Sequence, residues 1–143
     1  MGISSVNLVV LFVWVCLLSH VKYGEAIDEY KYTVHIINNL GNSNQLTTHC
    51  YTNGNDLGVH VLSTSQEFQW TLHRGLWVPK TYWCDMTAEN RSKTVQVFYD
   101  MKAFTDMCAD KGLGECFWSV RDDGFYMMDD VHGNWKLIVD WNS

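Results

Sequence analysis

LTTHCYTNGNDLGVHVLSTSQEFQWTLHRGLWVPKTYWC, residues 46–84, is the stretch that decides the fold. Within it, a polar turn, Asn53-Gly54-Asn55-Asp56, precedes two runs, 59–62 and 67–73, in which side-chain character alternates. A period of two places successive side chains on opposite faces of a strand. The stretch therefore predicts half-buried strands of an antiparallel sheet, with Cys50 and Cys84 on either side of them.

The rest of the chain repeats this pattern at intervals of about ten residues. Runs rich in β-branched and aromatic residues alternate with Gly, Asn and Asp turns, and Asp123-Gly124 is a strong two-residue hairpin signal. We expect strands at 30–38, 45–52, 59–62, 67–73, 80–87, 93–100, 116–121, 124–129 and 134–141. The fold class predicted is mainly all-β: a single small antiparallel β-sandwich of two sheets.

One segment departs from the strand pattern. Phe104, Met107 and Cys108 follow the i, i+3, i+4 spacing of a helix face. Asp100 can cap the first turn and Gly112 can end the last one. We therefore expect one short helix in this segment, which aims Cys108 at the sheet.

The first 26 residues have the features of a secretory signal peptide. Residues 8–18, LVVLFVWVCLL, are apolar, but a helix of that length rises roughly 16 Å, about half of the ~30 Å hydrocarbon core of a bilayer. Gly24 and Ala26 supply the small residues of a cleavage site. We expect cleavage after Ala26, leaving a secreted domain at 27–143 with no membrane association. A retained membrane anchor is the alternative.

Cysteine usage agrees with secretion. Cys16 lies in the apolar run, and the remaining Cys50, Cys84, Cys108 and Cys116 form an even set in a short chain, which predicts two disulfides. The sequence contains no CxxC pair, so we expect no zinc site. We favour the pairing Cys50–Cys116 with Cys84–Cys108, which closes long loops. Cys50–Cys84 with Cys108–Cys116 remains the alternative.

Charge and motifs exclude several functions. The formal net charge is −6 and Lys and Arg do not cluster, so a nucleic-acid partner is not expected. The chain has no Gly-rich phosphate loop and no GxSxG nucleophile motif. His35, His60 and His73 lie within predicted strands, where we expect them to face solvent. We expect no catalytic residue, no cofactor and no metal.

One motif suggests an enzyme instead. WTLHRGLWVP at 70–79 is similar to FTLHGLWP, the first active-site motif of the acid ribonucleases that include the pistil S-ribonucleases. His73 would then be a catalytic acid or base. Arg74 and Val78 interrupt the motif, and the second motif, HExxKHG, is absent. Acid–base cleavage of RNA uses two facing histidines, so a secreted ribonuclease using His73 is the alternative function.

A second resemblance covers nearly all of residues 27–143. It rests on HC at 49–50, DLG at 56–58, Trp70, YWCD at 82–85, the late cysteines Cys108 and Cys116, and FWSVRDDGFY at 117–126. In order and spacing these motifs resemble the plant self-incompatibility S-protein homologue family. The family commonly has HCxSxDxDLG, and the turn before Leu57 is less charged here.

The resemblance implies a small secreted sandwich with disulfides and a non-enzymatic role as an extracellular ligand. The founding members, from poppy pistils, signal to incompatible pollen. We expect a monomer in the apoplast that presents loops to an unidentified cell-surface receptor, since recognition residues concentrate on loops of a rigid scaffold. Asn90-Arg91-Ser92 is an N-glycosylation sequon, with Asn90 as the acceptor. The candidate recognition residues are Asn53, Asn55, Asp56, Arg74, Arg91, Arg121, Asp122 and Asp123.

Overall fold

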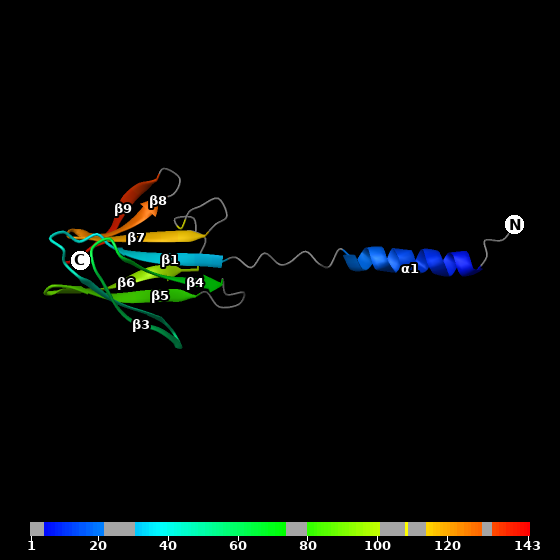
Figure 1. The fold of residues 1–143 in the computed structure, drawn as a ribbon, viewed down its shortest axis with the longest axis horizontal. Coiled ribbons are helices and arrows are strands. Elements are labelled where there is room, and N and C mark those ends of the chain that lie inside the picture. The colour runs from blue at the N-terminus through cyan, green and yellow to red at the C-terminus, as the bar shows by residue number, and fades with distance from the viewer. Residues whose placement is uncertain (1–4, 22–30, 74–79, 101–107, 109–113, 130–132) are drawn as a thin grey trace.

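The computed structural model describes residues 5–21, 31–73, 80–100, 108, 114–129 and 133–143. The first element, α1 (Ser5–Val21), lies away from the strands in Figure 1. Its side chains at 8–15 are all exposed although most are large and apolar. No helix in the described part of the chain is long and apolar enough to cross a membrane. The expected cleavage site after Ala26 lies outside the described residues.

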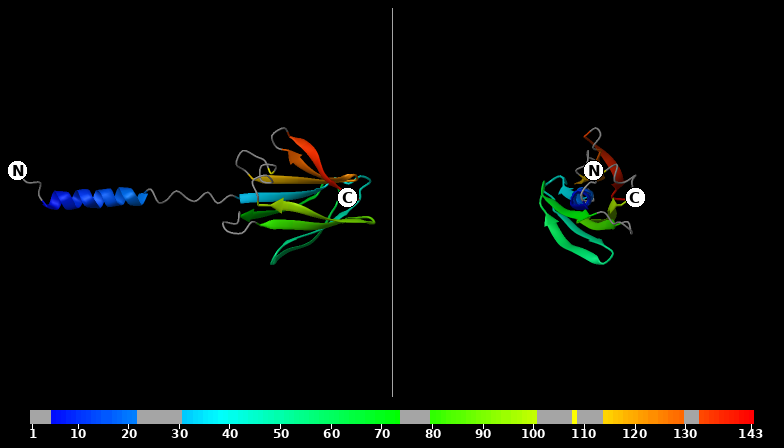
Figure 2. Two further views of the ribbon diagram at one scale, coloured as in Figure 1. Left: turned by 180° about the vertical axis from the view of Figure 1, so that it is seen from behind. Right: turned by 90° about the vertical axis from the view of Figure 1, so that its right-hand side faces the viewer.

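Two sheets stack face to face and confirm the predicted sandwich (Figure 2). Apolar residues alternate with polar ones along most strands, so each sheet turns one face to the common core. The five-stranded sheet has the order β4-β1-β7-β8-β9 and the four-stranded sheet the order β3-β2-β5-β6. The strands are β1 (Lys31–Asn38), β2 (Leu46–Thr52), β3 (Asn55–Leu62), β4 (Glu67–His73), β5 (Thr81–Ala88), β6 (Arg91–Tyr99), β7 (Glu115–Arg121), β8 (Gly124–Asp129) and β9 (Asn134–Asp140).

Two details of the sheets differ from the prediction. β1 and β7 pair in parallel, whereas the other pairs of described strands are antiparallel. Residue alternation carries no information on strand direction, so the sequence pattern could not reveal this pair. Asn55 and Asp56, predicted to lie in a turn, are instead the first residues of β3. The turn is Asn53-Gly54, and Gly54 has a φ of +86°, a conformation that favours glycine.

The favoured disulfide pairing was wrong. The bonds are Cys50–Cys84 and Cys108–Cys116. Cys50 lies directly opposite Cys84 in the β2–β5 pair, with their Cα atoms 4.0 Å apart. Cys116, on β7, belongs to the other sheet. Register, which brings opposite residues within disulfide reach, decides the pairing here, whereas the prediction relied on loop length.

The predicted short helix falls on residues that are mostly outside the described part of the chain. Of that segment the structure describes Asp100, which is buried, and Cys108, which is bonded to Cys116. The helix therefore remains a prediction. The bond between Cys108 and Cys116 attaches this connection to the start of β7.

Trp118 occupies the centre of the core and links the two sheets. It lies on β7, is fully buried, and its Nε1–H donates a 2.9 Å hydrogen bond to the carbonyl oxygen of Val97 on β6. Val97 is the extra residue of a β-bulge, because Gln96 pairs with Trp83 while Phe98 pairs with Tyr82. The Trp118 indole of the five-stranded sheet therefore provides a hydrogen-bond donor for the buried Val97 carbonyl at the bulge of the four-stranded sheet.

Replacing Trp118 with Phe should destabilise the fold more than the same change at a surface tryptophan. Trp118→Phe leaves the Val97 carbonyl buried without its donor and reduces the packed volume, with an expected cost of about 2–4 kcal/mol in unfolding free energy. Trp135→Phe, on the partly exposed side of β9, is the matched control and should cost less than about 1 kcal/mol. Urea unfolding of both variants measures this. Equal losses would contradict the role of Trp118.

Candidate functional site

The predicted recognition residues divide between the two ends of the sandwich. Four connections, 39–45, 63–66, 89–90 and 122–123, and the C-terminus lie at the end opposite the start of β1, which we call the loop end (Figure 1). Arg91, Arg121, Asp122 and Asp123 lie at this end, although Arg91 and Arg121 belong to strands. Asn53, Asn55 and Asp56 lie at the β2–β3 hairpin, towards the other end. Arg74 falls outside the described residues.

At the loop end, charged side chains hold the connections to one another. Nη1 of Arg91 donates to the carbonyl oxygen of Asp122 at 2.5 Å, and its guanidinium lies 4.7 Å from the ring centroid of Trp141. The backbone N–H of Gly41 donates to the Asp122 carboxylate at 3.1 and 3.2 Å. A Cβ at Gly41 would lie 2.7 Å from Oδ2 of Asp122, so a larger residue there would displace the carboxylate from its present position. Arg91 and Asp122 therefore tie three connections together.

Arg121 is likewise used within the chain. Its guanidinium lies 4.3 Å from the ring centroid of Tyr126 and 5.3 Å from that of Trp135, and Nε donates to Oγ of Ser119. Tyr126 donates its O–H to Asp123 at 2.5 Å. That hydrogen bond is the main cause that raises the pKa of Tyr126. Arg121 and Asp123 thus both contact Tyr126, and these contacts stiffen the end of the sandwich.

Asn38 is a structural residue that the sequence did not reveal. It is fully buried at the end of β1, and its Nδ2 donates to the carbonyl oxygens of Asn44 and Leu62. Its Oδ1 accepts from the N–H of Leu40. One amide therefore fixes the β1–β2 connection against the end of β3. An Asn at the end of a strand looks like an ordinary turn residue, so composition alone gives no signal for this role.

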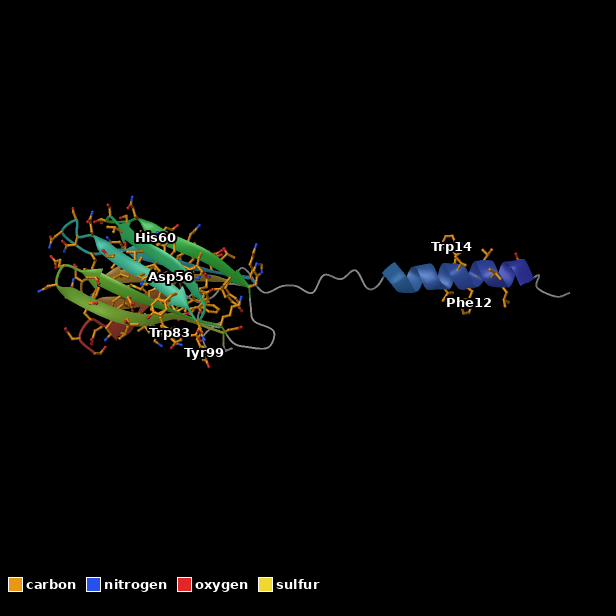
Figure 3. All side chains as sticks on the ribbon, turned by 90° about the horizontal axis from the view of Figure 1, so that it is seen from below. Phe12, Trp14, Asp56, His60, Trp83 and Tyr99 are labelled. Atoms are coloured by element: carbon orange, nitrogen blue, oxygen red, sulfur yellow. A yellow bond between two sulfur atoms is a disulfide. The ribbon has the colours of Figure 1, made fainter. Side chains whose placement is uncertain are left out.

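A different surface is built by the outward side of the four-stranded sheet. We call it the Tyr51 face, defined by the side chains that β3, β2, β5 and β6 turn away from the core. Strand register determines which of these side chains are neighbours across the strands. Tyr51 lies opposite Asp56 and Trp83, and His49 lies opposite Val59 and Asp85. Figure 3 looks onto this side of the molecule, with Asp56, Trp83 and Tyr99 labelled.

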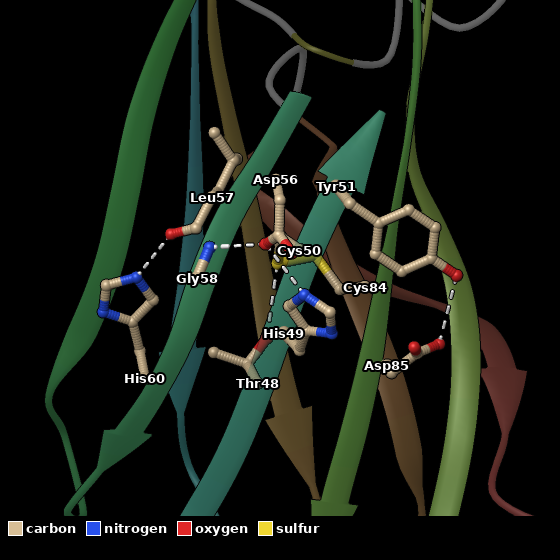
Figure 4. Close-up of polar contacts among 10 residues, drawn as sticks. All are labelled: Thr48, His49, Cys50, Tyr51, Asp56, Leu57, Gly58, His60, Cys84 and Asp85. Carbon is tan, nitrogen blue, oxygen red and sulfur yellow. Dashed lines mark hydrogen bonds and ion pairs between the residues drawn. A yellow bond between two sulfur atoms is a disulfide. The ribbon is translucent and has the colours of Figure 1, made fainter. Parts of the chain in front are cut away.

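Two carboxylates on the Tyr51 face are held by hydrogen bonds (Figure 4). Oδ1 of Asp56 is 2.8 Å from Nε2 of His49 and accepts the N–H of Gly58 at 2.8 Å. The Gly58 hydrogen bond first, and then the His49 hydrogen bond, lower the pKa of Asp56. Oδ1 of Asp85 accepts from Thr94 at 2.6 Å and from the Tyr51 hydroxyl at 3.4 Å. Partial burial and the Asp85 charge raise the pKa of Tyr51.

Exposed apolar groups border this face along β3, the edge strand. Val59 is 63% exposed and Val61 is 56% exposed, the largest values among the large hydrophobic residues described after α1. β3 carries no Lys, Arg or Pro, the residues that commonly protect sheet edges. Leu62 and His60 face the other way, and His60 stacks on Phe68 with 3.8 Å between ring centroids. His60 is thus half-buried and not the solvent-facing residue that we expected.

His35 was also wrongly predicted to face solvent. It lies on β1, is 8% exposed, and its ring stacks on Phe117. Nδ1 is 3.2 Å from Glu67 and Nε2 is 2.5 Å from Glu115. Since neutral imidazole has only one N–H, both contacts are hydrogen bonds only when a further proton is present on the ring or on a carboxyl group. The cluster joins β4, β1 and β7 across the outside of the five-stranded sheet.

His73, the candidate of the ribonuclease alternative, is an exposed residue at the end of β4. His35 pairs with Gln69, four residues earlier in β4, so the two histidines are separated by roughly 13 Å along the sheet. His49 and His60 belong to the other sheet. The described histidines therefore do not face one another across a common site. Among the described residues, no group of three or more His, Cys, Asp or Glu is arranged to hold a metal.

The Asp56 contacts predict how its carboxyl titrates. Because the folded-state pKa is lowered, the stabilisation from these hydrogen bonds is present above the unfolded pKa of about 3.9 and is lost as the pH falls through the folded value. An NMR titration of the Asp56 Cγ should give a midpoint below about 3.9. In His49→Ala the midpoint should rise but stay lowered, because the Gly58 hydrogen bond remains. A midpoint at or above 3.9 in the wild type would contradict this geometry.

The arrangement can be compared with known proteins. The family model described as "Plant self-incompatibility protein S1" matches residues 33–141. S-protein homolog 1 of Arabidopsis thaliana is 29% identical over 115 residues, covering 80% of this chain and 73% of the relative. Self-incompatibility protein S1 of Papaver rhoeas is 25% identical over 105 residues, covering 73% of each chain.

A solved structure supports the fold. It is described as that of self-incompatibility protein homologues, "a widespread family of small, highly stable, secreted proteins from plants". The match has a TM-score of 0.58 at 18% identity and covers 82% of this chain and 100% of that one. The family model spans the sandwich from β1 to β9. The chain therefore belongs to the plant self-incompatibility protein S1 family, the S-protein homologues.

Proposed function

We propose that residues 27–143 form a secreted extracellular ligand that is recognised by a receptor on plant cells. The observation that carries this proposal is the family match across the whole sandwich, since the Papaver rhoeas relative is named for self-incompatibility. A role in pollen–pistil recognition is the form of this function that the relative's name suggests. The receptor remains unidentified.

The scaffold is suited to such a role. The Cys50–Cys84 bond crosslinks two central strands, and the Cys108–Cys116 bond holds a long connection to β7. Crosslinks of this kind reduce the conformational freedom of the unfolded chain and so favour the folded state. At the loop end, the contacts of Arg91, Asp122 and Asn38 hold the connections in place. A pre-ordered surface loses less entropy when it binds, which favours affinity.

The proposal includes secretion to the apoplast. Disulfides are typical of oxidising extracellular compartments. The apolar helix α1 exposes its side chains at 8–15, as expected of a signal peptide that is later cleaved off. Cleavage after Ala26 and a monomeric state remain part of the proposal. Asn90 is exposed in the turn between β5 and β6, which is compatible with N-glycosylation of the sequon. A glycan there would stand beside the loop end.

Binding of the labelled, oxidised domain at 27–143 to intact plant cells, pollen included, tests this function. We expect saturable binding that unlabelled protein displaces and that reduction of the disulfides abolishes, because a folded ligand occupies a limited number of receptors. A ribonuclease assay of the wild type and His73→Ala runs in parallel as the control for the enzyme alternative.

Either of two results would contradict the ligand proposal. One is binding that never saturates on any tissue. The other is RNA cleavage by the wild type that disappears in His73→Ala, which would point to the secreted ribonuclease instead.

A further inference from the structure

The Tyr51 face carries two carboxylates and no Lys or Arg side chain from its four strands; its histidine, His49, pairs with Asp56. Asp56 and Asp85 are on this face, as their strand partners Tyr51 and His49 require. The two basic residues of β6 face the other way: Arg91 pairs with Ala88 and Lys93 with Met86, and both partners are buried. The whole chain has a formal net charge of −6. This face is therefore electrostatically complementary to a cationic partner.

Both carboxylates keep an acceptor oxygen for that partner. Within the described part of the chain, the hydrogen bonds to Asp56 and to Asp85 all go to Oδ1. Each Oδ2 is thus left to accept from outside the chain, while the bonds at Oδ1 fix the orientation of the group. A carboxylate held in this way is prepared for a charge-assisted hydrogen bond with little loss of side-chain entropy.

Tyr51 lies beside both carboxylates, opposite Asp56 and hydrogen-bonded to Asp85, and Trp83 lies on its other side in the same row. The centroids of Tyr51 and Trp83 are 6.5 Å apart, with 28° between the ring planes, and both side chains are half-buried. Elsewhere the chain places its own arginines on such rings, Arg91 on Trp141 and Arg121 on Tyr126 and Trp135. Among the described residues, no Lys or Arg lies over Tyr51 or Trp83; the ring of His49 also lies near Tyr51, with centroids 5.4 Å apart. Rings beside carboxylates favour a guanidinium, which stacks and forms hydrogen bonds at once.

We propose that the Tyr51 face is the docking surface for a basic partner protein, whose arginine side chain lies over Tyr51 and Trp83 and pairs with Asp85 and Asp56. This inference rests on the proposed function and specifies the chemistry of the receptor surface. Val59 and Val61 at the edge of the face add an apolar border that the same partner covers. Lysine fits less well, because its ammonium neither stacks nor binds two acceptors in a fixed plane.

A titration of the domain at 27–143 with a hexa-arginine peptide, followed by two-dimensional NMR, tests the chemistry without the receptor. We expect shifts confined to the Tyr51 face, including the Trp83 indole N–H. Hexa-citrulline, which keeps the shape but lacks the charge, should cause none. The apparent affinity should fall about tenfold in Asp85→Asn and at least as much in Trp83→Ala.

The control variant is Glu89→Gln. It removes one acidic charge at the β5–β6 turn, away from the Tyr51 face, and should bind hexa-arginine within about twofold of the wild type. Asp85→Asn is nearly isosteric, so it tests the site even if Trp83→Ala fails to fold. Equal weakening by Glu89→Gln and Asp85→Asn, or shifts spread over all acidic residues, would overturn the inference.

The same variants separate this inference from the proposed function. In the cell-binding assay, Asp85→Asn should compete about tenfold less well than Glu89→Gln. If the wild type binds cells and Asp85→Asn competes equally, the docking surface is wrong while the ligand function stands. If the wild type binds no cells, the ligand function loses its support, and the peptide titration still decides whether the face binds arginine.

Discussion

The hydrogen bond from the Trp118 indole to the Val97 carbonyl connects the two sheets at their buried centre. It is possible because a bulge in β6 removes one carbonyl from the ladder and leaves it to be satisfied from the other sheet. The bulge also fixes which residues of β5 and β6 face the core. Tyr82 and Cys84 point inward, so Trp83 and Asp85 must point outward. The composition of the Tyr51 face therefore follows from the packing of the core.

The Cys50–Cys84 bond fixes the same arrangement from the neighbouring strand. Both sulfur atoms are buried, and the bond joins residues that are opposite one another in the register of β2 and β5. A slip of one residue would turn every side chain of β2 to the other face, which the bond forbids. Tyr51 is consequently held beside Trp83, and His49 beside Asp85. The buried disulfide thus fixes the relative positions of the aromatic rings and the carboxylates on the Tyr51 face.

Much of the fold could be predicted from alternation and turn residues alone. The runs around Ile36, Trp70 and Tyr126 form strands within a residue or two of the expected bounds, because burial of one strand face produces alternating apolar and polar residues in the sequence. Features that depend on which strands pair produce no such pattern. The partner of Cys50, the parallel alignment of β1 with β7, and the carboxylates around His35 all arise from neighbours that are distant in sequence.

The candidate site shows the same division. Charged residues such as Arg91 and Asp122 could be selected from sequence, but the structure uses their charges to hold the connections at the loop end of the sandwich together. Asp56 could be selected from sequence, but the Tyr51 face as a whole could not be, because Asp56, Tyr51 and Asp85 come from three strands and become neighbours only through register. An exposed charge is informative about binding only when its hydrogen-bonding capacity is not already used inside the chain.

The most direct test of the recognition surface is photo-crosslinking on intact cells from two matched positions. Gln96 lies opposite Trp83 on the Tyr51 face, and Gln69 lies on the outside of the five-stranded sheet; both are exposed. Each would be replaced by p-benzoylphenylalanine in the oxidised domain. A discrete crosslinked cell-surface protein from position 96, with little from position 69, is the result we predict. Equal crosslinking from both positions, or crosslinking from position 69 alone, would contradict recognition through the Tyr51 face.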